Sequence, residues 1–168
     1  MSFQLKIIQD TISPKLAKLI KECSNPKKVL EAMGTSLVSV TKRAFNDPSL
    51  RPSTWAEVKK SSGAPLKRSQ TLWQSIRVTQ ITSNAVSVGT DRPYAAHHQF
   101  GTKPYVIRPS GKKALFWPGA AHPVKQVNHP GLPARPFFPF DDSGKMIPSA
   151  RKLVEAAART AMAKLLKG

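Results

Sequence analysis

The side chains best suited to acid–base chemistry or metal binding are four histidines, two of them adjacent. His97 and His98 lie in the stretch GTDRPYAAHHQFGT, residues 89–102, and His122 and His129 follow. Neighbouring residues on a helix diverge by about 100°, so His97 and His98 do not easily face one ion. The sequence has few acids near these histidines, no HExxH motif and no cysteine pair. We therefore expect no metal and no cofactor.

The sequence offers little support for a nucleophile. Cys23 is the single cysteine, and no histidine or second cysteine is close to it in sequence, so a buried structural thiol is expected. One cysteine can form no disulfide within the chain, which is typical of a reducing compartment. The sequence also lacks a serine-centred elbow and paired carboxylates. A hydrolase that uses His97 or His98 is therefore the weakest functional hypothesis, and we expect no enzyme.

The charge of the chain is strongly positive. Lysine and arginine number 27 against nine aspartates and glutamates, a net charge of +18 spread along the sequence. A basic body favours a polyanionic neighbour, namely nucleic acid, an acidic membrane or an acidic protein, although it could instead keep copies soluble. The candidate polyanion contacts are basic residues in two predicted loops: Lys59, Lys60, Lys67, Arg68, Lys112 and Lys113.

No apolar run approaches the roughly 20 residues of a membrane span. The first ten residues, MSFQLKIIQD, lack a signal-peptide core and cleavage site. We therefore expect no membrane association, and a protein made in a cytoplasm or built into a particle there.

The length of 168 residues fits one domain, residues 1–168, with four parts. We expect a helical N-terminal part over 1–46, a long basic loop over 47–74, a β-sheet part over 75–146 with a short helix over 93–101, and a C-terminal helix over 147–168. The predicted fold is α+β: N-terminal helices and a C-terminal helix packed on a small, mainly antiparallel β-sheet with long loops.

Apolar residues at three- and four-residue steps predict these helices. Residues 3–20 are predicted to form one helix kinked at Pro14 or two short helices. A further helix begins with Asn25 as N-cap and Pro26 in its first turn. This further helix has a predicted buried stripe of Val29, Met33, Leu37, Val40 and Ala44.

Alternating residues predict the strands. Residues 75–82 form a hairpin with residues 86–89 around a Ser83–Asn84 turn, with Val78 and Gln80 on one face and Ile81 on the other. A second hairpin is expected between residues 105–108 and 113–117, with a further strand over 124–127. Trp55 is expected to dock the long loop onto the body, and the three phenylalanines in 137–140 to return apolar bulk to the core.

Several motifs follow one another in order: W…K…PL…L-x-x-S-I, V-x-V-G-T, Y-A-x-x-H-Q-F-G-T and HPG…A-R-P-F-F. This ordered set resembles the phage virion-morphogenesis and tail-completion proteins, the Mu-like and lambdoid-like group of neck and minor tail components. The resemblance runs from near residue 50 to near residue 160. Its residues are Trp55, Lys60, Leu66, Leu72, Ser75, Ile76, Val86, Val88, Gly89, Tyr94, Ala95, Gln99, Phe100, Gly101, Thr102, His129, Pro130, Gly131, Ala134, Arg135, Pro136, Phe137 and Phe138.

The resemblance implies a structural virion protein of the neck or tail, which acts in tail completion and head–tail joining without catalytic residues. It implies a homo-oligomer, commonly a sixfold ring, with neck, adaptor and tail-tube or terminator proteins as partners, and with the DNA channel as a candidate neighbour. The expected location is the virion, and the host cytoplasm during assembly. We expect the loops 51–70 and 103–135 to reach adjacent subunits.

Within this resemblance the motif residues serve packing or interfaces. Gly89 and Gly101 would supply backbone geometry, Tyr94 and Phe100 packing, and Arg135 a polar tie or an interface. The full set is Trp55, Gly89, Tyr94, Gln99, Phe100, Gly101, His129, Pro130, Gly131, Arg135, Pro136 and Phe137.

The alternative is a basic nucleic-acid-binding module. The charge supports it. However, the aromatic residues follow no stacking pattern on one sheet face, and the sequence has no helix-turn-helix or RNA-binding motif.

Overall fold

The computed structural model describes residues 26–56, 66, 69–111 and 113–167. The helical segment predicted over residues 3–20, Cys23 and the proposed cap Asn25 lie outside the described residues. The described part is α+β, as predicted, but its strands form two separate two-stranded antiparallel sheets rather than one.

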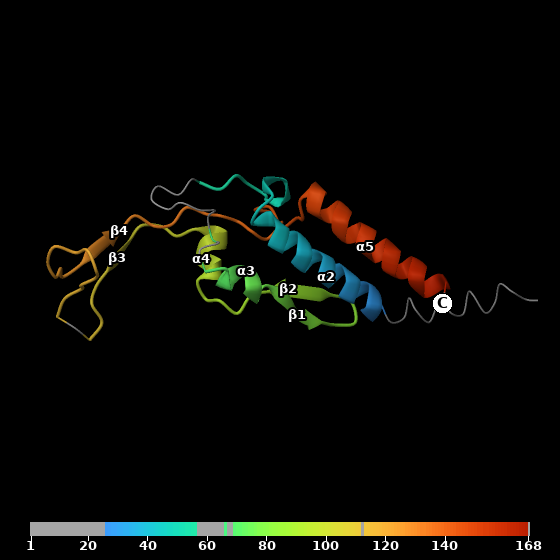
Figure 1. The fold of residues 1–168 in the computed structure, drawn as a ribbon, viewed down its shortest axis with the longest axis horizontal. Helices are drawn as coiled ribbons and strands as arrows, with labels where there is room; N and C mark the ends of the chain where they lie inside the picture. Colours follow the sequence, from blue (N-terminus) through green and yellow to red (C-terminus); the bar gives the residue numbers. More distant parts are fainter. Residues whose placement is uncertain (1–25, 57–65, 67–68, 112, 168) are drawn as a thin grey trace, which may run out of the picture.

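Two long helices lie side by side and form the scaffold of the body (Figure 1). They are α2 (Lys27–Ala44) and α5 (Pro148–Lys167). Pro26 lies at the N-cap position of α2 rather than inside its first turn, and no side chain among the described residues caps this end.

Helix α2 is buried on more than the predicted stripe, because α5 packs on it and so does a β-hairpin. Leu37, Val40 and Ala44 are buried as predicted, whereas Val29 and Met33 are only half-buried. Leu30 and Gly34 are buried in addition. At Gly34 the hairpin comes so close that an added Cβ would lie 2.6 Å from Val86 Cγ2.

The first hairpin joins β1 (Arg77–Ile81) to β2 (Val86–Gly89), and the predicted turn is confirmed by a 2.8 Å bond from Thr82 N to Ala85 O. The predicted alternation is wrong beyond Val78. The register shifts between Val78 and Gln80, so Ile81 is half-buried and Gln80 exposed. An extra residue in one strand reverses which side chains face inward.

The second predicted hairpin is wrong. Strand β3 (Tyr105–Ile107) pairs antiparallel with β4 (Val127–His129), not with residues 113–117. Leu115 instead forms an isolated bridge with Val124. Pro109 and Pro118 flank the segment 110–117, and proline cannot donate to a ladder, so the pairing there stays short. The strand expected over 124–127 is therefore displaced to β4.

We call residues 103–130 the arm. In Figure 1 the arm extends away from the two long helices, at the opposite end of the molecule from the C-terminus of α5. Its strands pack mainly on each other. In the part of the chain that the structure describes, no helix is long and apolar enough to cross a membrane.

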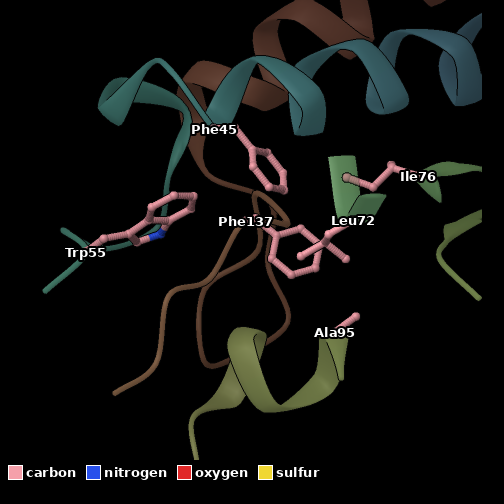
Figure 2. Close-up of a cluster of buried hydrophobic side chains, with 6 residues drawn as sticks. All are labelled: Phe45, Trp55, Leu72, Ile76, Ala95 and Phe137. Carbon is pink, nitrogen blue, oxygen red and sulfur yellow. The ribbon is translucent and has the colours of Figure 1, made fainter. Parts of the chain in front are cut away.

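The main core gathers side chains from segments far apart in sequence (Figure 2). Two short helices contribute to it, α3 (Thr71–Ser75) and α4 (Ala95–Phe100). The buried cluster consists of Phe45, Trp55, Leu72, Ile76, Ala95 and Phe137. A second cluster joins α2 to α5 and to a 3-10 helix, η1 (Pro48–Leu50), through Val40, Ala44, Leu50 and Ala150.

Candidate functional site

The motif residues meet where the returning segment 131–140 crosses α4, and we call this arrangement the clamp. The Gln99 side-chain oxygen accepts hydrogen bonds from the backbone N–H groups of Phe137, at 3.0 Å, and Phe138, at 3.1 Å. The backbone N–H of Arg135 donates to the carbonyl of His98 at 2.7 Å. These bonds fix the return so that Phe137 enters the core.

Replacing Gln99 with leucine is expected to destabilise the fold by about 2 kcal/mol, because two part-buried N–H groups lose their acceptor. Gln99→Glu keeps an acceptor of the same length and is expected to cost less. Urea denaturation followed by circular dichroism measures both variants. If Gln99→Leu and Gln99→Glu lost the same stability, the side-chain oxygen of residue 99 would not be what holds the returning segment.

A close backbone crossing lies beside these bonds. Thr102 N donates to Leu132 O at 2.9 Å, and Leu132 N donates back to Thr102 O at 3.2 Å and to Thr102 Oγ1 at 2.9 Å. Gly101 and Gly131 flank the crossing, both with positive φ, of 72° and 85°. An added Cβ would lie 2.7 Å from Leu132 O at Gly101 and 2.2 Å from Thr102 O at Gly131. Only glycine lets the two backbone segments approach this closely.

His129 lies at the base of the arm and has a structural role. Its Nδ1 accepts a 3.0 Å hydrogen bond from Gly131 N, which shapes the HPG turn. Its ring stacks on Tyr105, with centroids 4.9 Å apart. Pro130, the residue between His129 and Gly131 in the sequence, is exposed. The Nδ1 atom of His129 thus serves to hold the backbone of the turn.

Trp55 and Arg135 join residues 51–56 to the clamp. Trp55 is buried, and its Nε1 donates to Pro136 O at 2.8 Å. The guanidinium of Arg51 lies 3.8 Å from the centroid of the Trp55 ring. Arg135 donates from Nε and Nη2 to the carbonyl of Ala56 at 3.2 and 3.1 Å. Both motif side chains therefore use their polar groups to hold backbone carbonyls.

Three motif residues differ from the roles expected of them. Phe100 is 79% exposed rather than packed, because α4 buries only Ala95, near its other end. Tyr94 is also exposed and lies edge-on to the His98 ring, at 5.9 Å between centroids. Gly89 has no positive φ; it ends β2 opposite Arg77. Phe100 and Tyr94 therefore remain candidates for an interface, not for the core of this chain.

The adjacent histidines lie in different surroundings. His97 is exposed, whereas His98 is half-buried, and its Nδ1 has no hydrogen-bond partner among the described residues. Burial, and then the positive charges of Arg135 and His97, lower the pKa of His98. No group of three or more histidine, cysteine, aspartate or glutamate side chains in the described ranges could hold a metal ion.

Stability is expected to fall in acid partly through His98. Its folded-state pKa is lowered, so the folded state resists protonation that the unfolded chain accepts. The contribution is present above the ordinary histidine pKa of about 6.5 and is lost as the pH falls below it. His98→Gln should therefore lose less stability between pH 7.5 and 5.5 than the parent chain, as thermal denaturation would measure. His122→Gln, at an exposed site of the arm, is the control; an unchanged pH profile in His98→Gln would contradict the assignment.

Of the candidate polyanion contacts, Lys59, Lys60, Lys67, Arg68 and Lys112 lie outside the described residues. Lys113 is exposed on the arm.

Sequence reasoning missed a groove beside the clamp, with a volume of ≈ 660 Å³. Its lining includes Phe100, Ala134, Phe138, Phe140, Asp141 and Asp142. The turn that carries the acids is fixed by Asp141 Oδ1, which accepts hydrogen bonds from Ser143 N, Ser143 Oγ and Lys145 N. The one sequence signal for an acidic site here was that residues 92–140 contain no acid and that acids resume at Asp141.

The side chains of the clamp thus hold distant backbone segments of the chain together. Comparison with known proteins identifies the family of the chain. The model of the phage virion morphogenesis family matches residues 8–150, and the chain belongs to this family. It therefore has a role in phage virion morphogenesis.

The chain is also similar to the Mu-like prophage FluMu G protein 2 of Haemophilus influenzae, with 30% identity over 92 residues. That match covers 55% of this chain and 64% of the relative. No solved structure matches the chain.

Proposed function

We propose that the chain is a structural protein of the phage neck or tail, which completes the tail and joins it to the head. It acts by assembling into a ring of identical copies, expected to be sixfold, and not by catalysis. Its partners are other neck, adaptor and tail-tube or terminator proteins, and its location is the neck or tail of the virion after assembly in the host cytoplasm. Membership of the virion morphogenesis family and the similarity to a Mu-like prophage protein support this proposal.

The observation that carries the non-catalytic part is how the motif side chains use their polar groups. Gln99 and Trp55 bond to backbone groups of the returning segment, and Arg135 bonds to the backbone carbonyl of Ala56. A catalytic site would instead aim a nucleophile and a base at a common point. The clamp is therefore a device that fixes the arm to the core.

A phage with a nonsense codon in this gene tests the proposal. In a host that does not suppress the codon, we expect heads and tails to accumulate unjoined, as electron microscopy would show, and plasmid-borne wild-type chain to restore joined particles. Normal joined particles made without the chain would refute the proposed function.

A second candidate, a nucleic-acid-binding module, is favoured by one observation: residues 92–140 contain seven lysines and arginines and no acid. Titration of duplex DNA at several salt concentrations tests it. Tight binding at physiological salt, with affinity falling steeply as salt rises, would support this candidate.

A further inference from the structure

The arm carries large apolar side chains that the described chain leaves substantially exposed. Tyr105 and Val106 are each 49% exposed, Phe116 is 67% and Trp117 45% exposed. Exposed large apolar side chains of this kind are typical of an interaction surface, because burying them is worth about 25 cal/mol per Å².

We call residues 115–124 the tip of the arm. Backbone hydrogen bonds hold the tip in a conformation that leaves Phe116 and Trp117 exposed. Leu115 and Val124 exchange two backbone hydrogen bonds, at 2.8 and 3.0 Å, just before the two aromatics. Ala120 N then donates to Trp117 O at 3.0 Å and closes the turn. Because the tip is fixed before binding, little ordering entropy is lost on docking.

The charge of the arm defines its partner further. The described arm carries Lys103, Arg108, Lys113 and Lys125, all exposed, and no acid. A matching surface must combine an apolar floor with an acidic rim.

The groove beside the clamp has this combination. Phe138 and Phe140 line it, and the exposed ring of Phe100 lies at the same place. Asp141 and Asp142 supply the acids, and hydrogen bonds from Ser143 and Lys145 keep the pKa of Asp141 low, so that it stays charged. Within the described ranges, no ion pair joins Asp141 or Asp142 to a lysine or arginine.

We propose that the arm of one copy docks in the groove of a second copy, with Phe116 and Trp117 against the phenylalanines and the arm lysines beside Asp141 and Asp142. The arm extends away from α4 (Figure 1), and α4 carries Phe100, which lines the groove. The contact joins two different surfaces, so each bound copy offers a new groove, and the chain of copies closes into a ring when the rotation permits. This inference rests on the ring assembly of the proposed function and names the surfaces that make it.

Two variants separate the two halves of the contact. The arm variant carries Phe116→Ser and Trp117→Ser; the groove variant carries Phe100→Ser and Asp142→Lys. All four side chains are exposed, so the circular dichroism spectrum and melting temperature should not change. By analytical ultracentrifugation, the parent chain should associate increasingly with concentration, whereas each variant alone should remain a monomer.

Mixing the variants gives the decisive result. The arm variant keeps a good groove and the groove variant keeps a good arm, so an equimolar mixture should form a 1:1 dimer and nothing larger. A parent chain that stays monomeric, a variant that assembles like the parent, or a mixture that does not associate would each overturn the proposal. Met162→Ser, at an exposed apolar site on α5, is the matched control and should assemble normally.

Phage complementation distinguishes this inference from the proposed function. If the phage requires the chain but the arm variant complements fully and assembles, the docking is wrong and the proposed function stands. If copies associate through arm and groove but the phage makes joined particles without the chain, the proposed function fails and the docking stands. An arm variant that assembles normally but loses affinity for DNA would assign the arm to nucleic acid and overturn the docking.

Discussion

Gly101→Ala and Gly131→Ala are each expected to destabilise the protein by about 3 kcal/mol or more, enough to unfold a marginally stable domain. Gly101 has φ 72° and ψ −178°, a region that only glycine populates readily. The added methyl group would also lie 2.7 Å from Leu132 O and 2.9 Å from Ala134 N. At Gly131 it would lie 2.2 Å from Thr102 O and 2.9 Å from Lys103 C. At both positions the contacted atoms belong to the backbone, so no side chain can rotate away to relieve the clash.

Gly144→Ala is the matched control for these substitutions. Gly144 also has a positive φ, of 77°, but an added Cβ would meet no atom within 4 Å. Its substitution should therefore cost only the left-handed backbone conformation, about 1 kcal/mol. Urea denaturation of the three variants under one set of conditions compares them. If Gly101→Ala were as stable as Gly144→Ala, the backbone segments at Gly101 and Leu132 would not lie as close as the structure places them.

The long helices and the first hairpin could be predicted because their signals are local. A repeating apolar face identifies α2 and α5 within their own residues, and Ser83–Asn84 marks the turn between β1 and β2. The bulge after Val78 could not be predicted, since it depends on how β1 pairs with β2 and packs on α2.

The pairing of β3 and the clamp depended on contacts between distant residues. Tyr105 pairs with His129 across the whole arm, and Gln99 binds backbone 38 and 39 residues later. Turn chemistry at Ser110–Gly111 suggested a nearer partner for β3. The local sequence pattern does not show whether β3 pairs with residues 113–117 or with β4, because both segments are short and flanked by prolines.

The motif residues were identified from the sequence, but not every role expected of them agrees with the structure. Phe100 illustrates this: an aromatic residue in a short helix predicts packing, whereas burial of α4 on one side only leaves the ring exposed. The groove was not predictable either, because it forms only when α4, the returning segment and the Asp141 turn come together.

Phe137→Ala is expected to cost about 4 kcal/mol, whereas Phe100→Ala should change stability by no more than about 0.5 kcal/mol. Phe137 is 0% exposed in the main core. Its ring lies beside that of Phe45 (Figure 2), at 5.5 Å between centroids, and its centroid is 4.8 Å from that of Phe138. Removing this ring leaves a cavity between α2, α3 and α4, which the surrounding segments fill only in part.

Phe137→Ala and Phe100→Ala are a matched test because both delete a phenyl ring, one buried in the core and one exposed at the groove. Thermal and urea denaturation measure folding, and ultracentrifugation measures association. Phe100→Ala should fold normally and associate less, since its ring lies at the groove, whereas Phe137→Ala should fail in folding first. A Phe100→Ala variant that unfolds as readily as Phe137→Ala would mean that Phe100 supports the core. Its assignment to the interface between copies would then be wrong.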